Sequence, residues 1–385
     1  MRIYLDNAAT SFPKPSAVLE AMHRYLLENG APAGRGAYRT ALAVDRTVAR
    51  CRERAANLFG VADPRRFVFT FNGTDALNLA LCGICRPGDH VLTSAWEHNS
   101  VLRPLRALEH QRHIHVTRLS PDATGRLSPA QVQAALTSAT RLVVLQQASN
   151  VTGVIQPLDE IGDVVRRHGA LLLVDAAQSA GHWPIDLSQS PFDLWACSGH
   201  KGLLGPLGTG LLYVGPRAED LLEPTRWGGT GTHSEEDVQP RELPDRLESG
   251  NLNVPGIVGL EAALAELAQH DLADAHSRAR ALTLHLWHGL SAIPRVALYG
   301  PSPDAVPRTA VVSCNIAGYA PQEAAALLDE HFEIECRAGL HCAPGVHRAL
   351  GTLAAGGTVR FSPGRYTTRE HIDCALAAVR TLAGH

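Results

Sequence analysis

The two lysines of this chain, Lys14 and Lys201, contrast with its 33 arginines. Because arginine supplies positive charge everywhere else, a lysine here indicates chemistry that arginine cannot do. The clearest such chemistry is a Schiff base, which needs a primary amine that can lose its proton. Lys14 lies between two prolines in a predicted loop, whereas Lys201 stands in the small-residue sequence SGHKG at the end of a predicted strand. Lys201 is therefore the candidate catalytic residue.

Two other reactive groups follow predicted strands. Asp175 ends the apolar run ALLLVD, where a carboxylate needs a partner such as an arginine, a metal or a protonated nitrogen heterocycle. Gly73 and Thr74 open a predicted helix after the strand FVFTF, and the free N–H groups of a helix N-terminus favour phosphate. Asp175 and Thr74 each have a simpler alternative as a helix cap. A lysine, a carboxylate and a phosphate site are together the groups that pyridoxal phosphate requires.

These groups lie in a region where apolar runs alternate with helical patterns. Such alternation predicts an α/β protein with a mainly parallel sheet covered by helices on both faces. Ligands bind such sheets beyond the carboxyl ends of the strands, where the candidate residues stand. The predicted strands cover 67–71, 89–94, 141–150, 170–175, 192–198 and 207–215, and the predicted helices cover 15–30, 39–60, 74–85 and 158–169.

A polar segment rich in glycine and proline, 228–256, separates this region from the rest of the chain. A long helical pattern follows from about 257 to 290, and mixed strands and helices continue to the end. The expected division is an N-terminal segment 1–15 packed near the active site, a large α/β domain 16–255 and a small α+β domain 256–385.

Composition excludes several classes of protein. The net charge of −3 and the pI of about 6.7 argue against a nucleic-acid-binding protein, which usually carries a basic stripe. No apolar run reaches the roughly 18 residues of a membrane span, and the first residues lack the pattern of a signal peptide. We therefore expect a soluble cytoplasmic protein without a membrane partner.

The eight cysteines are expected to be free thiols, because the chain is long and lacks an export signal. Cys82 and Cys85 form a C-x-x-C inside a helical pattern without a second pair nearby. We interpret them as buried helix residues rather than as a redox or metal site, and we expect no metal centre.

The whole chain resembles the class V aminotransferase superfamily, and within it the cysteine desulfurases and selenocysteine lyases. The resemblance implies a pyridoxal-phosphate-dependent transferase fold of type I, with a seven-stranded, mainly parallel sheet flanked by helices. It is carried by the sequences YLDNAAT (4–10), GTDALNLAL (73–81), EHNS (97–100), SNVTG (149–153), VDAAQSAGH (174–182), SGHKGLLGPLGTGLLY (198–213), ESGNLNVPGIVGL (248–260), RAGLHCAP (337–344) and VRFSPGRYTT (359–368).

The resemblance also implies residue roles. Lys201 would form the Schiff base with pyridoxal 5'-phosphate, Asp175 would pair with the pyridinium nitrogen, and Gln178 would bind the phenolic oxygen. His98 would stack on the ring and move protons, and Arg360 would clamp the substrate carboxylate. The phosphate would be held by Gly73, Thr74, Ser198 and His200, and the substrate side of the ring would be lined by Asn150, Asn7 and Ala8.

Cys342, in the sequence RAGLHCAPG, is the implied sulfur acceptor. On a mobile loop, its thiolate would attack the sulfur of a cofactor-bound cysteine and leave alanine and a persulfide. Arg337 and His341 are candidate cations that would help keep the sulfur ionised. A buried and inert thiol is the alternative interpretation of Cys342.

The sequence departs from the family at three places. Asn251 stands where a threonine usually reaches the phosphate of the neighbouring subunit. A homodimer with a shared site is therefore expected, in which an asparagine side chain replaces the threonine hydroxyl at that phosphate. Leu340 and Tyr38 each replace a histidine that is common in the family. These changes leave open the substrate and the sulfur acceptor, which would be a protein or a reductant.

Other functions are compatible with these residues. A C–S β-lyase, a selenocysteine lyase or an aminotransferase would keep the cofactor, and a lyase would release pyruvate and ammonia without needing Cys342. A cofactor-free thiol hydrolase using His341 and Cys342 would leave Lys201 unexplained. An inactive scaffold would not need Lys201, Asp175 or Cys342.

Overall fold

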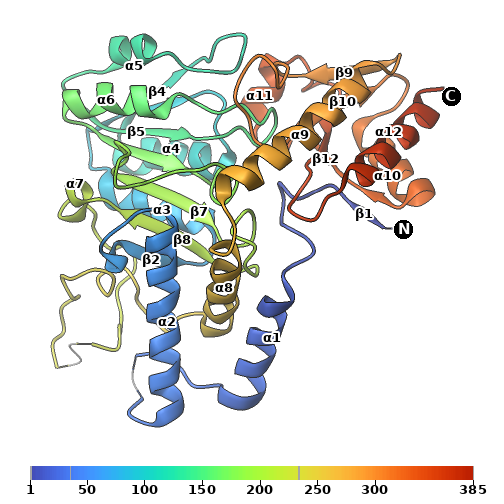
Figure 1. The fold of residues 1–385 in the computed structure, drawn as a ribbon. Helices are drawn as coiled ribbons and strands as arrows, with labels where there is room; N and C mark the ends of the chain where they lie inside the picture. The colour runs from blue at the N-terminus through green and yellow to red at the C-terminus, as the bar shows by residue number, and fades with distance from the viewer. Residues whose placement is uncertain (1, 35, 233–234, 385) are drawn as a thin grey trace.

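A seven-stranded sheet forms the centre of the larger part of the molecule (Figure 1). The structure, a computed structural model, describes residues 2–34, 36–232 and 235–384. The strands of this sheet are β2 (Phe67–Thr70), β3 (His90–Ser94), β4 (His115–Leu119), β5 (Thr140–Gln146), β6 (Leu171–Asp175), β7 (Leu194–Ser198) and β8 (Gly210–Val214). They lie in the order β2-β8-β7-β6-β5-β3-β4. Strand β8 runs antiparallel to β2 and β7, and the other neighbouring pairs are parallel.

Helices cover both faces of this sheet, as the alternating pattern predicts. In β6, Leu172 and Val174 join one core cluster while Leu171 and Leu173 join the other, because successive side chains of a strand point to opposite faces. The helices of this part are α1 (Ser16–Arg24), continued by the π-helix η1 (Tyr25–Asn29), α2 (Arg39–Leu58), the 3₁₀ turn η2 (Pro64–Arg66), α3 (Gly73–Ile84), α4 (Asn99–Arg112), α5 (Pro129–Ala135), α6 (Leu158–His168), α7 (Pro216–Glu219) and α8 (Val254–Leu267).

A second, antiparallel sheet organises the C-terminal part. Its order is β12-β13-β10-β9, formed by β9 (Val296–Tyr299), β10 (Val312–Ile316), β12 (Arg337–Gly339) and β13 (Thr358–Phe361). Helices α9 (Leu272–Ser291), α10 (Pro321–Phe332), α11 (Pro344–Ala349) and α12 (Arg369–Gly384) accompany it. The N-terminal strand β1 (Ile3–Tyr4) pairs in parallel with β11 (Ile334–Glu335) and lies beside these elements in Figure 1.

The long helical pattern from about 257 to 290 is two helices in the structure. Helix α8 ends at Leu267, and α9 begins after Asp271, whose side chain accepts a hydrogen bond from the N–H of Ala273 at 2.7 Å. Ile257 of α8 belongs to the core of the large sheet, whereas Leu286 of α9 belongs to the core of the small sheet. From this packing we propose that the domains divide at 268–271, rather than at residue 256 as the sequence predicts.

A buried ion pair ties α2 to the segment before α8. The Arg52 guanidinium binds the Glu248 carboxylate through two hydrogen bonds of 2.8 and 2.5 Å, and the N–H of Phe69 donates to the same carboxylate. Arg52→Ala leaves Glu248 buried and without its charged partner, so we expect the free energy of unfolding to fall by about 3 kcal/mol. Denaturant titration measures this loss. Arg50→Ala, which removes an exposed arginine 3.5 Å from Glu261, serves as control and should cost about 1 kcal/mol or less. Equal losses would contradict the interpretation.

Candidate active site

A cavity of about 340 Å³ lies where the carboxyl ends of β5, β6 and β7 meet the small sheet. It takes lining residues from the large domain, from the N-terminal segment and from β12 and β13. The sequence-predicted residues that line it are Ala8, Gly73, Thr74, His98, Asn150, Asp175, Gln178, Ser198, His200, Lys201, Cys342 and Arg360. The tertiary structure therefore brings together residues that are spread over most of the chain.

Two predicted residues lie outside this cavity. Asn7 is buried beside it, where its side chain donates to the carbonyl of Ser362 at 3.0 Å and accepts from the N–H of Phe12. Asn251 lines a separate small pocket together with Phe71. A direct contact of Asn7 or Asn251 with a ligand in the cavity of the same chain is therefore not supported.

Lys201 lies in the turn that follows β7, and it is one of the residues that line the cavity. Burial lowers the pKa of this amine to about 8, while the Asp175 carboxylate acts in the opposite direction. Lys201 makes no side-chain hydrogen bond or ion pair with the residues that the structure describes. An unpaired amine that can lose its proton near neutral pH is suited to act as a nucleophile.

Asp175 is the last of the five residues of β6, which are all buried. It therefore lies at the carboxyl end of a central strand. One carboxylate oxygen accepts from the N–H of Ala177 at 2.9 Å. Gln178, three residues further, donates from its side chain to the carbonyl of Ala8 at 2.8 Å. The turn after β6 therefore supplies a buried acceptor for a cationic group and is itself held by the N-terminal segment.

A group of hydrogen-bond donors lines the cavity near the start of α3. The N–H of Gly73, at the start of α3, donates to the hydroxyl of Ser198 at 3.1 Å, and a Cβ at Gly73 would approach this hydroxyl to 2.7 Å. The Thr74 hydroxyl lies 2.7 Å from that of Ser100. The Nδ1 atom of His200 is buried and has no hydrogen-bond partner among the described residues. Amide, hydroxyl and imidazole donors at a helix N-terminus fit a phosphate group.

His98 precedes α4 and caps it. Its Nδ1 atom accepts a hydrogen bond from the N–H of Ser100 at 3.0 Å. Burial lowers the pKa of the imidazole, so the ring is neutral at neutral pH and its proton is on Nε2. This ring can therefore stack on an aromatic ring without burying a positive charge of its own.

Asp6 is a site residue that sequence reasoning missed. Arg360 donates from Nη2 to the Asp6 carboxylate at 2.8 Å and from Nη1 to the carbonyl of Asn150 at 3.0 Å. The Nε atom of Arg360 is buried without a partner among the described residues. Asp6 therefore orients the guanidinium and leaves a donor for an anionic ligand. The sequence YLDNAAT contained this residue, but the contact spans 354 positions and has no local signal.

Glu97 is a second residue without an assigned role in the sequence. It is buried next to His98, where its carboxylate accepts from the hydroxyl of Ser94 at 2.7 Å and from the N–H of Gln146 at 2.8 Å. Burial raises the pKa of this carboxyl to about 8. Glu97 thus links the ends of β3 and β5 below the cavity.

Cys342 is exposed in the short connection between β12 and α11. Its carbonyl accepts from the N–H of Asn99 at 2.8 Å, and the Asn150 side chain donates to the carbonyl of His341 at 2.5 Å. Both His341 and Cys342 have left-handed backbone torsions, with φ of 48° and 57°. Such torsions persist in non-glycine residues only where the surroundings hold them. The backbone of this turn is therefore anchored at two points, and the mobility expected from the sequence stays a prediction.

The two candidate cations near this thiol differ. Burial lowers the pKa of His341 to about 2, and its ring is hydrogen-bonded to Thr358, so it stays neutral. Arg337 lines the cavity and lies 3.7 Å from the Asp6 carboxylate. Of the two, only Arg337 supplies positive charge near the thiol of Cys342.

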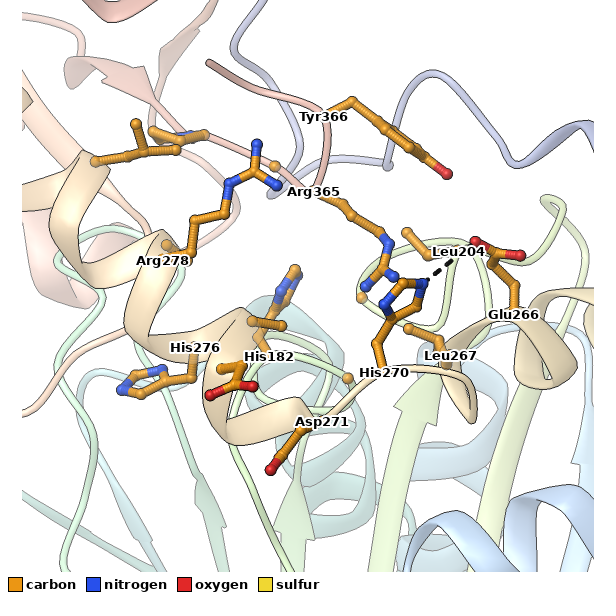
Figure 2. Close-up of a pocket in the computed structure, with 18 residues that line it drawn as sticks. His182, Leu204, Glu266, Leu267, His270, Asp271, His276, Arg278, Arg365 and Tyr366 are labelled. Carbon is orange, nitrogen blue, oxygen red and sulfur yellow. Dashed lines mark ion pairs between the residues drawn. The ribbon is translucent and has the colours of Figure 1, made fainter. Parts of the chain in front are cut away.

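A larger cavity of about 470 Å³ lies between the domains, beyond Gly202, and is shown in Figure 2. The ring of His270, in the turn between α8 and α9, lies 3.7 Å from the carboxylate of Glu266 in the last turn of α8. Arg278 donates to the carbonyl of Thr367 at 3.1 Å. Among the described residues that line it, none belongs to the predicted site. The smaller cavity, which holds the lysine, is therefore the candidate active site.

Within residues 2–34, 36–232 and 235–384, no three histidine, cysteine or acidic side chains are grouped to hold a metal ion, and no helix is long and apolar enough to cross a bilayer. Cys82 and Cys85 lie at the end of α3, and burial raises the pKa of both thiols.

The chain is similar in sequence to known proteins over nearly its whole length. The family model for class-V aminotransferases matches residues 3–374. A probable cysteine desulfurase of Methanothermobacter thermautotrophicus is 35% identical over 386 residues, which cover 99% of this chain and 95% of that protein. The cysteine desulfurase IscS of Pectobacterium carotovorum is 35% identical, with 99% and 93% covered.

Solved structures give the same result. The apo cysteine desulfurase of Thermococcus onnurineus superposes with a TM-score of 0.91 at 33% identity, covering 100% of this chain and 95% of that one. The cysteine desulfurase CsdA of Escherichia coli has a TM-score of 0.88 at 30% identity, with 99% and 94% covered. A C-DES variant with glycine covalently linked to its PLP cofactor has a TM-score of 0.84 at 27% identity, with 98% and 96% covered.

Proposed function

This chain belongs to the class-V aminotransferase family and to its cysteine desulfurases, and from that premise we propose that it converts L-cysteine to L-alanine with sulfur passing to Cys342. The enzyme depends on pyridoxal phosphate. The observation that carries the proposal is that the buried amine of Lys201 and the exposed thiol of Cys342 line the same cavity. A lyase would need the amine but not the thiol.

The residues present fit the cofactor. The unpartnered Nδ1 of His200 and the hydroxyl of Ser198 would hold the phosphate, and the buried carboxylate of Asp175 would pair with the ring nitrogen. Lys201 would carry the cofactor covalently. Bound pyridoxal phosphate supplies an electron sink that stabilises negative charge on the substrate carbons.

Side chains of this protein would bind the substrate and move its protons. Arg360 would bind the substrate carboxylate through its free Nε while Asp6 keeps the guanidinium in place. Lys201, with a pKa near 8, would take the proton from the substrate Cα and return it at neutral pH. The neutral ring of His98 would pack on the cofactor and relay protons from Nε2.

Cys342 would act on the substrate sulfur. A bond forms between its thiolate and that sulfur, and the C–S bond of the substrate breaks with its electron pair left on carbon. The carbon takes a proton and becomes the methyl group of alanine, so one cysteine and one thiol yield one alanine and one persulfide. Arg337 lines the same cavity as this thiol.

The products of the purified holoenzyme test the proposal. With L-cysteine and no reductant, we expect alanine and, by mass spectrometry, one additional sulfur atom on the peptide that contains Cys342. The peptide of Cys374, an exposed thiol on α12, is the internal control and should stay unmodified. Pyruvate with an unmodified Cys342 peptide would make the chain a β-lyase and overturn the proposal.

We also propose a cytoplasmic homodimer that passes sulfur to an acceptor protein. Asn251 lies outside the cavity of its own chain, beside Phe71 and Arg226, which supports a role in a partner's site. The anchored turn of Cys342 implies that an acceptor approaches the thiol, because the thiol itself is held near the cavity.

A further inference from the structure

The carbonyl oxygen of His200 is surrounded by an unusual number of donors. The N–H and the hydroxyl of Ser11 donate to it at 3.0 and 3.2 Å, the hydroxyl of Thr10 at 3.0 Å, and the ammonium of Lys14 at 2.8 Å. A carbonyl oxygen has two lone pairs, so four donors exceed its ordinary capacity. Lys14 is the one charged donor among the four.

Lys14 is partly buried in this contact, and burial disfavours its charged form. Burial lowers the pKa of its ammonium to about 8, and no carboxylate within the described residues forms an ion pair with it. Its hydrogen bonds go to the His200 carbonyl and to the Ser11 hydroxyl, at 2.7 Å. A partly buried charge without a counter-ion persists where its hydrogen bonds offset the loss of water.

The carbonyl that Lys14 binds belongs to the peptide unit that joins His200 to Lys201. Because a peptide unit is planar, a contact that fixes its oxygen also fixes the backbone nitrogen of Lys201 and the Cα atoms of His200 and Lys201. The positive charge of Lys14 also reaches the imidazole of His200, whose pKa is lowered to about 4 by burial and by the two lysines.

The same N-terminal segment contacts the site at other points. The carbonyl of Ala8 accepts from the side chain of Gln178, and the N–H of Ala8 donates to the hydroxyl of Ser362, two residues after Arg360. The segment thus connects the substrate side of the cavity to the turn of Lys201, and Lys14 is its charged attachment to that turn.

We propose that Lys14 is a positioning residue for the cofactor, which orients the His200 imidazole and the Lys201 amine by holding the peptide unit between them. The proposal rests on the proposed function only through the cofactor. Lys14 differs from an arginine in its compact ammonium, which donates to the carbonyl and to the hydroxyl from one nitrogen, whereas a guanidinium is larger and planar.

Cofactor release from the holoenzyme tests this role. We expect Lys14→Met to raise the dissociation constant of pyridoxal phosphate about tenfold, because a charged hydrogen bond to the turn is lost. The matched control is Thr10→Val, which removes a neutral donor from the same oxygen and should change the constant by less than about threefold. Lys14→Arg keeps the charge and should bind the cofactor more tightly than Lys14→Met. Visible absorption of the bound cofactor during serial dilution measures each constant.

Two results would overturn the proposal: wild-type cofactor affinity in Lys14→Met, or equal weakening in Thr10→Val and Lys14→Met. If Lys14→Met does not fold, Lys14→Gln supplies the same comparison, since it retains a donor and loses only the charge. A purely structural Lys14 would lower the unfolding temperature without changing the dissociation constant. Alanine formation is recorded in parallel, so a wild-type enzyme that binds the cofactor but makes no alanine would refute the desulfurase activity and not the role of Lys14.

Discussion

Lys201→Ala and Lys201→Arg should both abolish alanine formation from L-cysteine, with a fall of at least about a thousandfold. The alanine variant has no amine, and the arginine variant has a guanidinium that stays protonated at every accessible pH. The native amine differs because burial lowers its pKa to about 8, so a substantial fraction is uncharged near neutral pH. An ordinary lysine would be almost fully protonated there.

The fold should survive these changes. The side chain of Lys201 makes no hydrogen bond or ion pair with the described residues, and its backbone carbonyl, which accepts from the N–H of Leu204, is kept in Lys201→Ala, so the change leaves no buried partner unsatisfied. Thermal unfolding and the visible absorption of the cofactor, measured on the same samples, separate loss of chemistry from loss of structure. A folded Lys201→Ala enzyme that makes alanine at a rate close to wild type would refute the assignment.

Cys342→Ser should lower alanine formation by about two orders of magnitude or more, because a serine hydroxyl is not ionised at neutral pH and cannot accept the sulfur. The change is conservative for the turn, whose anchor at this residue is the backbone carbonyl that accepts from Asn99. Cofactor affinity should therefore stay near the wild-type value.

Cys374→Ser is the matched control for this experiment, since Cys374 is also exposed but lies on α12 away from the cavity. It should leave the rate unchanged. Cysteine should still change the absorption of the bound cofactor in Cys342→Ser, because in the proposed mechanism the substrate binds at Arg360 before its sulfur is attacked. Full alanine formation by Cys342→Ser would mean that sulfur leaves without this thiol.

The strands that carry the site were predictable because they are buried on both faces. The runs FVFT, LLLVD and LWACS are fully buried in β2, β6 and β7, so each appears in the sequence as a continuous apolar segment that ends at a polar residue. The positions of Asp175 and Ser198 at the ends of β6 and β7, and of Gly73 shortly after β2, follow directly from that pattern.

Strand β4 was not predicted, for the opposite reason. It is an edge strand with the sequence HVTRL, and its residues are exposed or half-buried. Without a buried face it has no apolar signal, and only its pairing with β3 makes it a strand. The break between α8 and α9 was also missed, because apolar residues continue on both sides of it while the two helices pack on different domains.

Local patterns in the chain were thus sufficient for the α/β class, for most of the elements and for choosing Lys201 as the candidate amine, since these depend on residue type and on near neighbours. Only the three-dimensional packing decided that Asp6 orients Arg360, that His341 is neutral and that Lys14 holds the turn of Lys201. The first and third contacts join residues 354 and 186 positions apart. The charge of His341 depends on its burial, which the folded chain creates and which no short stretch of sequence encodes.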